Sequence, residues 1–117
     1  MRILALATTT LLTLLASTAV HAHAFLDHAE PRVGSTVPAA PREVALFFNE
    51  KLEPAFSSVE VSDASGARVD LGKTRVETTT MRIGLKHLSP GTYRVRWHVL
   101  SVDTHTTEGS FTFQVGP

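Results

Sequence analysis

The fold of this chain is decided by the stretch Thr92-Tyr93-Arg94-Val95-Arg96-Trp97-His98-Val99-Leu100, close to its C-terminal end. Large apolar or aromatic residues occupy every second position, namely Tyr93, Val95, Trp97 and Val99. The positions between them carry Arg94, Arg96 and His98. Because successive side chains of a β-strand point to opposite faces, this pattern predicts a strand with one face in a core and the other in water.

The same period of two recurs in shorter segments along the chain. It is present in residues 43–48, 59–61, 83–85 and 111–115. Turn signals such as Asp63-Ala64-Ser65-Gly66 and Ser89-Pro90-Gly91 separate these segments. The chain has no apolar stripe at helical spacing and no internal repeat. Together these features predict a single all-β domain, an antiparallel sandwich or barrel.

Residues 1–22 have the three parts of a secretory signal peptide. Arg2 supplies a positive start, residues 3–16 are apolar apart from a few threonines, and Val20-His21-Ala22 is a small-residue cleavage site. The apolar run is shorter than the about 20 residues that a membrane-spanning helix needs. We therefore predict a signal peptide over residues 1–22 and one exported domain over residues 23–117.

The cleavage point has two alternatives. Ala22-His23-Ala24 also fits the small-x-small pattern, and cleavage there would remove His23. Cleavage after Ser17-Thr18-Ala19 would leave His23 inside the chain. We favour cleavage after Ala22, which makes His23 the first residue of the exported protein.

Charge and cysteine content exclude several classes of function. The exported chain would carry 10 basic and 11 acidic side chains, a formal net charge of −1, since only Arg2 leaves with the signal peptide. Without a basic run, we expect neither nucleic acid nor an anionic membrane surface as a partner. The absence of cysteine excludes a disulfide framework and a blue-copper site. We expect a monomer held together by its hydrophobic core.

An N-terminal His23 would offer two metal donors from one residue. Its α-amine titrates near pH ~8 and its imidazole near pH ~6.5, so both can act as neutral ligands in neutral solution at modest cost. A planar set of nitrogen donors with a carboxylate suits Cu(II) best among the divalent first-row ions. The hypothesis of a copper site depends on whether the rest of the chain supplies further ligands.

Asp103 and His105 are the candidates for these further ligands. They are two residues apart, so in extended chain their side chains point to the same side. If the strand continued beyond Trp97 with the same alternation, Ser101, Asp103 and His105 would point into the core. Burying these polar side chains is costly unless they are hydrogen-bonded or bind a metal. We therefore expect the strand to break near Leu100 to Val102, or the polar residues to lie at an open rim of the sandwich.

Several segments closely resemble the CopC family of bacterial periplasmic copper-resistance proteins. They are Gly91-Thr92-Tyr93-Arg94-Val95-Arg96-Trp97, Ser101-Val102-Asp103-Thr104-His105 and Gly109-Ser110-Phe111-Thr112-Phe113. Upstream, Glu30-Pro31, Gly34-Ser35, Pro41 and Phe48-Asn49-Glu50-Lys51-Leu52 follow His23 in the family's order. The resemblance covers essentially the whole exported domain. It implies an Ig-like, cupredoxin-like Greek-key β-sandwich of about seven strands.

The resemblance also implies a ligand and a partner. One Cu(II) ion would be held by the amine and Nδ1 of His23, an oxygen of Asp103 and an imidazole nitrogen of His105. Glu50 matches a glutamate of the family that orients the ligands by hydrogen bonding. The implied function is non-enzymatic: copper homeostasis or resistance in the periplasm, with copper delivered to a CopD-like transporter of the inner membrane.

One part of the chain departs from the pattern of some family members. Those members carry a methionine-rich loop that binds Cu(I), whereas residues 62–80 here contain neither methionine nor histidine. Met81 alone cannot build such a site. The sequence therefore predicts the Cu(II)-only form.

Two other classes of function remain open at this point. An N-terminal histidine with a second histidine also forms the copper brace of oxidative polysaccharide-cleaving enzymes, although Asp103 would occupy a position that oxygen chemistry needs open. Alternatively, Asp103 and His105 merely shape a loop of a non-metal Ig-like interaction module. The remaining histidines of the exported domain are interpreted as surface residues, namely His28, His87 and His98.

Overall fold

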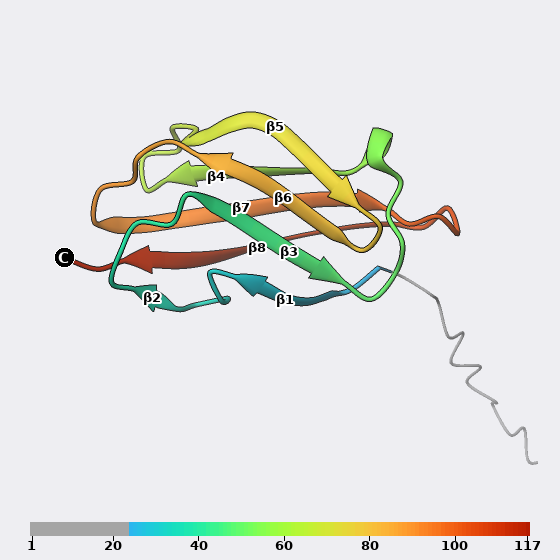
Figure 1. Cartoon of the computed structure of the whole chain (residues 1–117), viewed down its shortest axis with the longest axis horizontal. Helices are drawn as coiled ribbons and strands as arrows, with labels where there is room; N and C mark the ends of the chain where they lie inside the picture. The colour runs from blue at the N-terminus through green and yellow to red at the C-terminus, as the bar shows by residue number, and fades with distance from the viewer. Residues whose placement is uncertain (1–23) are drawn as a thin grey trace, which may run out of the picture.

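The alternating segments of the sequence form strands, and the strands pack into two sheets that face each other (Figure 1). The structure is a computed structural model and describes residues 24–117. The strands of sheet A are, in spatial order, β1 (Leu26–Glu30), β3 (Glu43–Phe48), β6 (Thr80–Leu85) and β5 (Asp70–Glu77). Those of sheet B are β2 (Thr36–Val37), β8 (Thr106–Val115), β7 (Gly91–Leu100) and β4 (Ser58–Asp63).

The connections between strands confirm the predicted Ig-like Greek-key sandwich. The chain changes sheet at every connection except the β5–β6 and β7–β8 hairpins. Neighbouring strands are antiparallel apart from the short parallel pairing of β2 with β8. The two-residue β2 brings the described strands to eight, where about seven were expected. Within residues 24–117, the only helical element is the 3-10 turn η1 (Pro54–Phe56), and no helix is long and apolar enough to cross a bilayer.

The ten residues of β7 show the predicted alternation of inward-facing and outward-facing side chains. Three of its apolar side chains are buried in the core, namely Tyr93, Val95 and Val99. Trp97 belongs to the same face but stays half-buried, because it lies across Gly109 of the neighbouring strand β8. A Cβ atom on Gly109 would lie 2.6 Å from the indole ring, so this position requires glycine. The ring of Phe48 meets the indole edge-to-face at 5.2 Å, which links β7 to sheet A.

The free edge of β4 is closed by side chains of the opposite sheet. An edge strand leaves backbone amides without a ladder partner. Here Oδ2 of Asp70 accepts the amide of Val61 at 2.8 Å, and Oγ1 of Thr74 accepts the amide of Val59 at 3.3 Å. Both acceptors lie on β5, so these hydrogen bonds join the two sheets along one side of the sandwich.

Asp70 is the buried carboxylate of this edge, with 1% of its side chain exposed. It accepts hydrogen bonds from the amides of Val61 and Gly72 and two from the guanidinium of Arg68. Burial by itself raises the pKa of a carboxyl group. The guanidinium and the two amides outweigh burial and hold the pKa of Asp70 below its ordinary value of 3.8.

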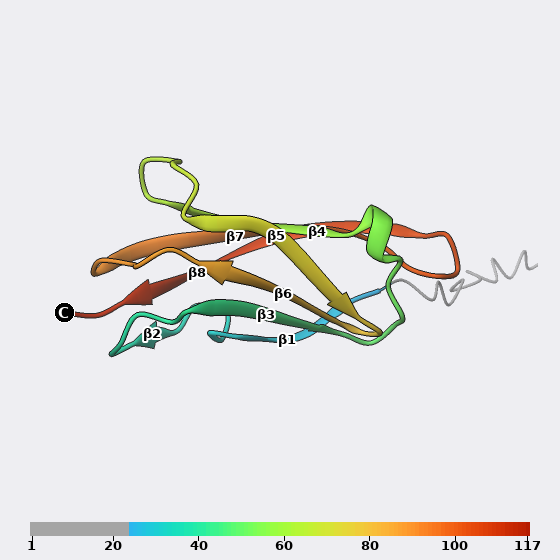
Figure 2. The same ribbon diagram turned by 45° about the horizontal axis from the view of Figure 1, so that its top comes forward.

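Segments that are distant in the sequence meet at one end of the sandwich (Figures 1 and 2). They are the start of β1, the η1 region and the turn between β7 and β8, and we call this the β7–β8 end. The C-terminus lies at the opposite end. The amide of Glu53 donates to the carbonyl of Leu100 at 2.8 Å, and the hydroxyl of Thr107 donates to the carbonyl of Ala24 at 2.7 Å. These contacts place the chain's first described residue beside the β7–β8 turn.

We predict that Asp70→Asn lowers the free energy of unfolding by about 3 kcal/mol near pH 7, because an amide nitrogen would face buried donors. The folded pKa of Asp70 is depressed, so its contribution is present above about pH 4 and is lost as the pH falls through that folded pKa. Urea unfolding at several pH values measures this, and the difference between wild type and variant should shrink in acid. Glu60→Gln is the control, because Glu60 is 52% exposed and lies 3.6 Å from the same Arg68. An equal loss in both variants would contradict the assignment.

Candidate metal centre

The strand β7 ends at Leu100, as the parity argument predicts, and the following residues form a tight turn. Ser101 keeps the inward direction of the strand and is fully buried. It forms a bridge with Leu52 of the segment that follows β3. The chain then leaves the sandwich, so that Asp103 and His105 lie at its rim with 32% and 44% of their side chains exposed.

Backbone hydrogen bonds close this turn. The amide of Ser101 donates to the carbonyl of His105 at 2.9 Å, and the amide of Thr104 donates to the carbonyl of Ser101 at 2.9 Å. Thr104 has a φ of +73°, which is unusual for a β-branched residue and stores strain. Such strained positions often occur at functional sites, because the surrounding structure must hold them. The turn therefore presents Asp103 and His105 in one defined arrangement.

The side chains of Asp103 and His105 face each other. Oδ1 of Asp103 lies 3.3 Å from Nδ1 of His105, and it also accepts the amide of His105 at 3.4 Å. The hydroxyl of Ser101 donates to the same carboxylate oxygen. Two donors that are each about 2.0 Å from one ion lie between about 2.8 and 4.0 Å apart, so this pair can ligate a single metal ion.

The surroundings of Asp103 favour its ionised form. The hydrogen bond from Ser101 does most to hold the pKa of Asp103 below its ordinary value of 3.8. Partial desolvation opposes this effect, and the contacts with His105 reinforce it. A carboxylate that is already deprotonated can bind a cation without first releasing a proton.

The third predicted ligand, His23, lies outside the described residues. The next residue, Ala24, is fully buried. The carbonyl of Ala24 accepts a hydrogen bond from the hydroxyl of Thr107, which lies two residues beyond His105 in the sequence. The described chain therefore begins at a residue that is hydrogen-bonded to β8. The predicted orienting residue Glu50 is half-buried in the segment behind the turn. In that segment, the carbonyl of Lys51 accepts the amide of Val102 at 3.0 Å.

The structure thus brings Asp103 and His105 together and places Glu50 in a segment that contacts their turn. Across residues 24–117, no three histidine, aspartate or glutamate side chains converge where a metal ion could bind. A metal site built on Asp103 and His105 would take any further side-chain donor of these types from outside residues 24–117.

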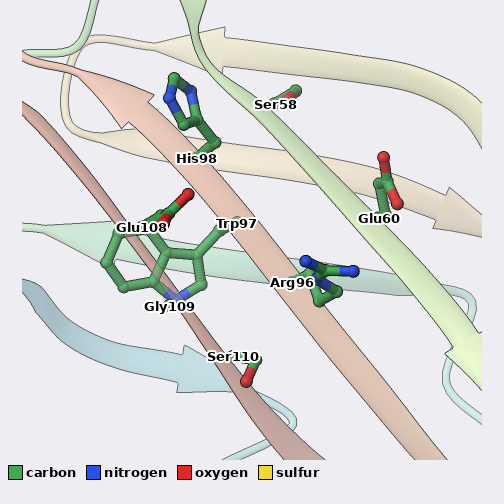
Figure 3. Close-up of a pocket in the computed structure, with 8 residues that line it drawn as sticks. All are labelled: Ser58, Glu60, Arg96, Trp97, His98, Glu108, Gly109 and Ser110. Carbon is green, nitrogen blue, oxygen red and sulfur yellow. The ribbon is translucent and has the colours of Figure 1, made fainter.

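The other histidines are on the surface, as predicted. His28 stacks on Phe47 with the ring centroids 4.2 Å apart, and its Nδ1 lies 2.8 Å from Asp27. His87 is exposed. His98 lies opposite Glu108 on the outer face of sheet B, in a shallow depression that does not include the β7–β8 turn (Figure 3). Glu60, His98 and Glu108 line this depression but do not converge into a group that could hold a metal ion.

Two residues near the turn were not identified from the sequence. The hydroxyl of Thr107 donates a hydrogen bond to the carbonyl of Ala24. Asn49 forms two hydrogen bonds with the backbone of Phe25, one through its side-chain oxygen and one through its own amide. Threonine is common in strands and asparagine is common after them, so neither residue type carries a specific signal. Their roles depend on contacts between segments that are 24 to 83 residues apart.

Comparison with known proteins yields one consistent family. The CopC domain family matches residues 26–116. Protein YobA of Escherichia coli K12 is 38% identical over 116 residues, which cover 96% of this chain and 90% of that protein. Copper transport protein CutJ of Bacillus subtilis is 33% identical over 99 residues, covering 81% of this chain but 18% of CutJ.

Solved structures agree with the sequence comparison. The crystal structure of CopC from Methylosinus trichosporium OB3b has a TM-score of 0.72 and 35% identity, covering 81% of this chain and 95% of that one. PcoC of Escherichia coli, described as a methionine-rich copper resistance protein, has a TM-score of 0.71 and 34% identity. That match covers 80% of this chain and 99% of PcoC. These proteins therefore share the sandwich with this chain, together with 34–35% of the aligned residues.

We predict that Ser101→Ala raises the pKa of Asp103 toward its ordinary value, because the hydrogen bond that does most to lower it is removed. An NMR titration of the side-chain carboxyl carbon in metal-free protein measures this pKa. Ser58→Ala, at an exposed serine of β4, serves as the control and should leave it unchanged. If the Asp103 pKa were the same in Ser101→Ala and wild type, Ser101 would not be the group that stabilises the carboxylate.

Proposed function

Since this chain belongs to the CopC family, we propose that it captures one Cu(II) ion in the periplasm and delivers it to a membrane partner. Family membership makes its function copper-related and places it among copper-binding resistance proteins, not among enzymes. The proposed ligands are His23 as the N-terminal residue, Asp103 and His105. The sequence resemblance to this family is confirmed.

The observation that carries the proposal is the paired arrangement of Asp103 and His105 at the β7–β8 end. Their donor atoms are 3.3 Å apart, and the neighbouring β8 holds the carbonyl of Ala24 at 2.7 Å. An amine and an imidazole at position 23 would add two nitrogen donors next to this pair. The resulting set of three nitrogens and one oxygen is the tetragonal environment that Cu(II) prefers. Zinc would bind the same donors less tightly, since Cu(II) outranks Zn(II) at a given nitrogen–oxygen site.

The chain's own residues perform capture and release. Ser101 and the strained Thr104 keep the turn in shape, so little ordering is required when the ion binds. Asp103 and His105 remain at a solvent-facing rim, where ligands of an acceptor protein can replace them one at a time. A protein that buffers and transfers copper needs both properties, a preformed site and an open rim.

Export provides the compartment for this function and also creates the ligand. We propose that residues 1–22 are removed as a signal peptide and that residues 23–117 are the working domain. Cleavage after Ala22 produces the free amine of His23, whereas cleavage two residues later would leave an incomplete site. The described core and the matched family region both lie within this proposed domain.

The proposed partner is a CopD-like copper transporter of the inner membrane. CutJ supports this proposal, because it is named a copper transport protein and the region similar to this chain is 18% of its length. A domain of this kind therefore occurs as part of a longer transport protein. In the present chain we propose a separate monomer that meets its partner transiently.

We also propose that this chain is the Cu(II)-only form. Met81 is fully buried on β6 and belongs to the hydrophobic core. The segment that contains the methionine-rich loop in some members of the family forms the Asp63–Gly66 turn and β5 here, and it contains no methionine. A thioether-rich Cu(I) site therefore has no ligands in this region.

We predict that processed protein beginning at His23 binds one Cu(II) ion and that a Gly-Ser insertion between Ala22 and His23 weakens binding strongly. The insertion separates the free amine from the imidazole of His23. The loss should exceed the roughly 10–100-fold effect of removing an outer-shell partner. Intact mass fixes the N-terminus and the stoichiometry, and competition with a chelator measures the dissociation constant. His98→Ala is the matched control for a surface histidine, and unchanged affinity in the extended protein would exclude the N-terminal chelate.

A second prediction concerns Glu50. If its carboxylate orients a copper ligand by hydrogen bonding, Glu50→Gln should lower the Cu(II) affinity by about 10–100-fold without changing the stoichiometry. Titration of the processed protein at pH 7 tests this. Glu53→Gln, which changes a half-buried glutamate of the same loop, should bind copper like wild type. Equal affinities in the two variants would remove Glu50 from the site.

A further inference from the structure

Two hydrogen-bonded contacts hold the backbone directly after position 23. The first comes from β8, where the Thr107 side chain points into the space between the sheets and its hydroxyl donates to the carbonyl of Ala24 at 2.7 Å. Thr107 pairs with the buried Val99 and is itself half-buried. This contact joins the start of the sheet A edge strand to sheet B, across 83 residues of sequence.

The second contact comes from Asn49, immediately after β3. Its Oδ1 accepts the amide of Phe25 at 2.7 Å, and its own amide donates to the carbonyl of Phe25 at 3.1 Å. The strand pairing of β1 with β3 begins one residue later, at Leu26 opposite Phe48. The Asn49 side chain therefore takes the place of a backbone carbonyl and extends the ladder toward the N-terminus by one residue.

The segment that contains Asn49 also touches the β7–β8 turn. The carbonyl of Lys51 accepts the amide of Val102 at 3.0 Å, and Leu52 bridges Ser101. The start of β1 and the Asp103–His105 turn are thus held against the same loop. Their relative position depends on this loop on one side and on Thr107 on the other.

We infer that Thr107 and Asn49 are positioning residues that hold the N-terminal backbone in register with Asp103 and His105 before copper binds. The inference rests on the proposed function, since it requires that the residue at position 23 is a ligand. Neither side chain touches the ion in this scheme. Thr107 holds Ala24 and Asn49 holds Phe25, so that His23 can close the chelate without further ordering of the backbone.

The expected effect follows from the cost of ordering a chain. Fixing the backbone of one residue costs an amount that corresponds to about a tenfold change in affinity. If Thr107 or Asn49 loses its hydrogen bond, part of this ordering must occur during copper binding. Each loss should therefore weaken Cu(II) binding by about tenfold, with no change in the ligands themselves.

The test uses the full precursor, exported and processed, with the N-terminus checked by intact mass. Thr107→Val removes the hydroxyl and keeps the shape, whereas Thr107→Ser keeps the hydroxyl. Asn49→Ala removes the acceptor at an exposed position, so the core remains intact. Thr112→Val makes the same exchange at an exposed threonine of β8 and is the matched control. Each variant is made with and without the Gly-Ser insertion before His23, and its Cu(II) dissociation constant and electron paramagnetic resonance spectrum are measured.

We expect Thr107→Val and Asn49→Ala to weaken binding by about tenfold and to alter the copper spectrum, while Thr107→Ser and Thr112→Val match wild type. In proteins with the insertion, the first two changes should have no further effect, because the N-terminal chelate is already lost. If both variants bind like wild type while the insertion weakens binding, the positioning role is wrong and the proposed function stands. Equal losses with and without the insertion would show that these residues act on the fold. An insertion without effect would overturn the N-terminal chelate and this inference together.

Discussion

The inward position of Ser101 at the end of β7 is the constraint on which the candidate site depends. The alternation of side chains along β7 points Ser101 into the core, where it is fully buried. Its hydroxyl is satisfied by Asp103, and its amide by the carbonyl of His105. A buried polar residue needs such partners, and the turn that follows supplies them from the Asp103 carboxylate and the His105 backbone. The same alternation that builds the core therefore also builds the Asp103–His105 turn.

The sandwich is closed on its two sides by side-chain hydrogen bonds between the sheets. On one side, Asp70 and Thr74 of β5 bond to the edge amides of β4. On the other side, Thr107 of β8 bonds to Ala24 just before β1. The first contact serves stability, because it satisfies an edge strand and a buried carboxylate together. The second lies beside the Asp103–His105 turn and fixes the backbone at Ala24 there.

Much of this arrangement can be predicted from local sequence patterns. The alternation of β7 identified its buried face, and the two-residue spacing identified Asp103 and His105 as a pair. The break after Leu100 followed from the cost of burying that pair without partners. Asp70, Thr107 and Asn49 could not be identified in this way, because their hydrogen bonds join separate strands or loops and nothing in the neighbouring residues indicates them. Trp97 shows the same limit, since its half-buried position results from packing over Gly109 on another strand.

The sequence by itself determined the strand pattern, the absence of cysteine ligands, the Asp103–His105 pair and the family to which these motifs point. These properties depend on residue type and short-range spacing, which period-two geometry converts directly into direction. Only the tertiary structure decided which backbone segments meet at the β7–β8 end, and that Ala24 is hydrogen-bonded to β8 beside the turn. That decision depends on how two sheets pack and how their edges satisfy their hydrogen bonds. Such contacts join residues far apart in the chain, and a local pattern carries no information about them.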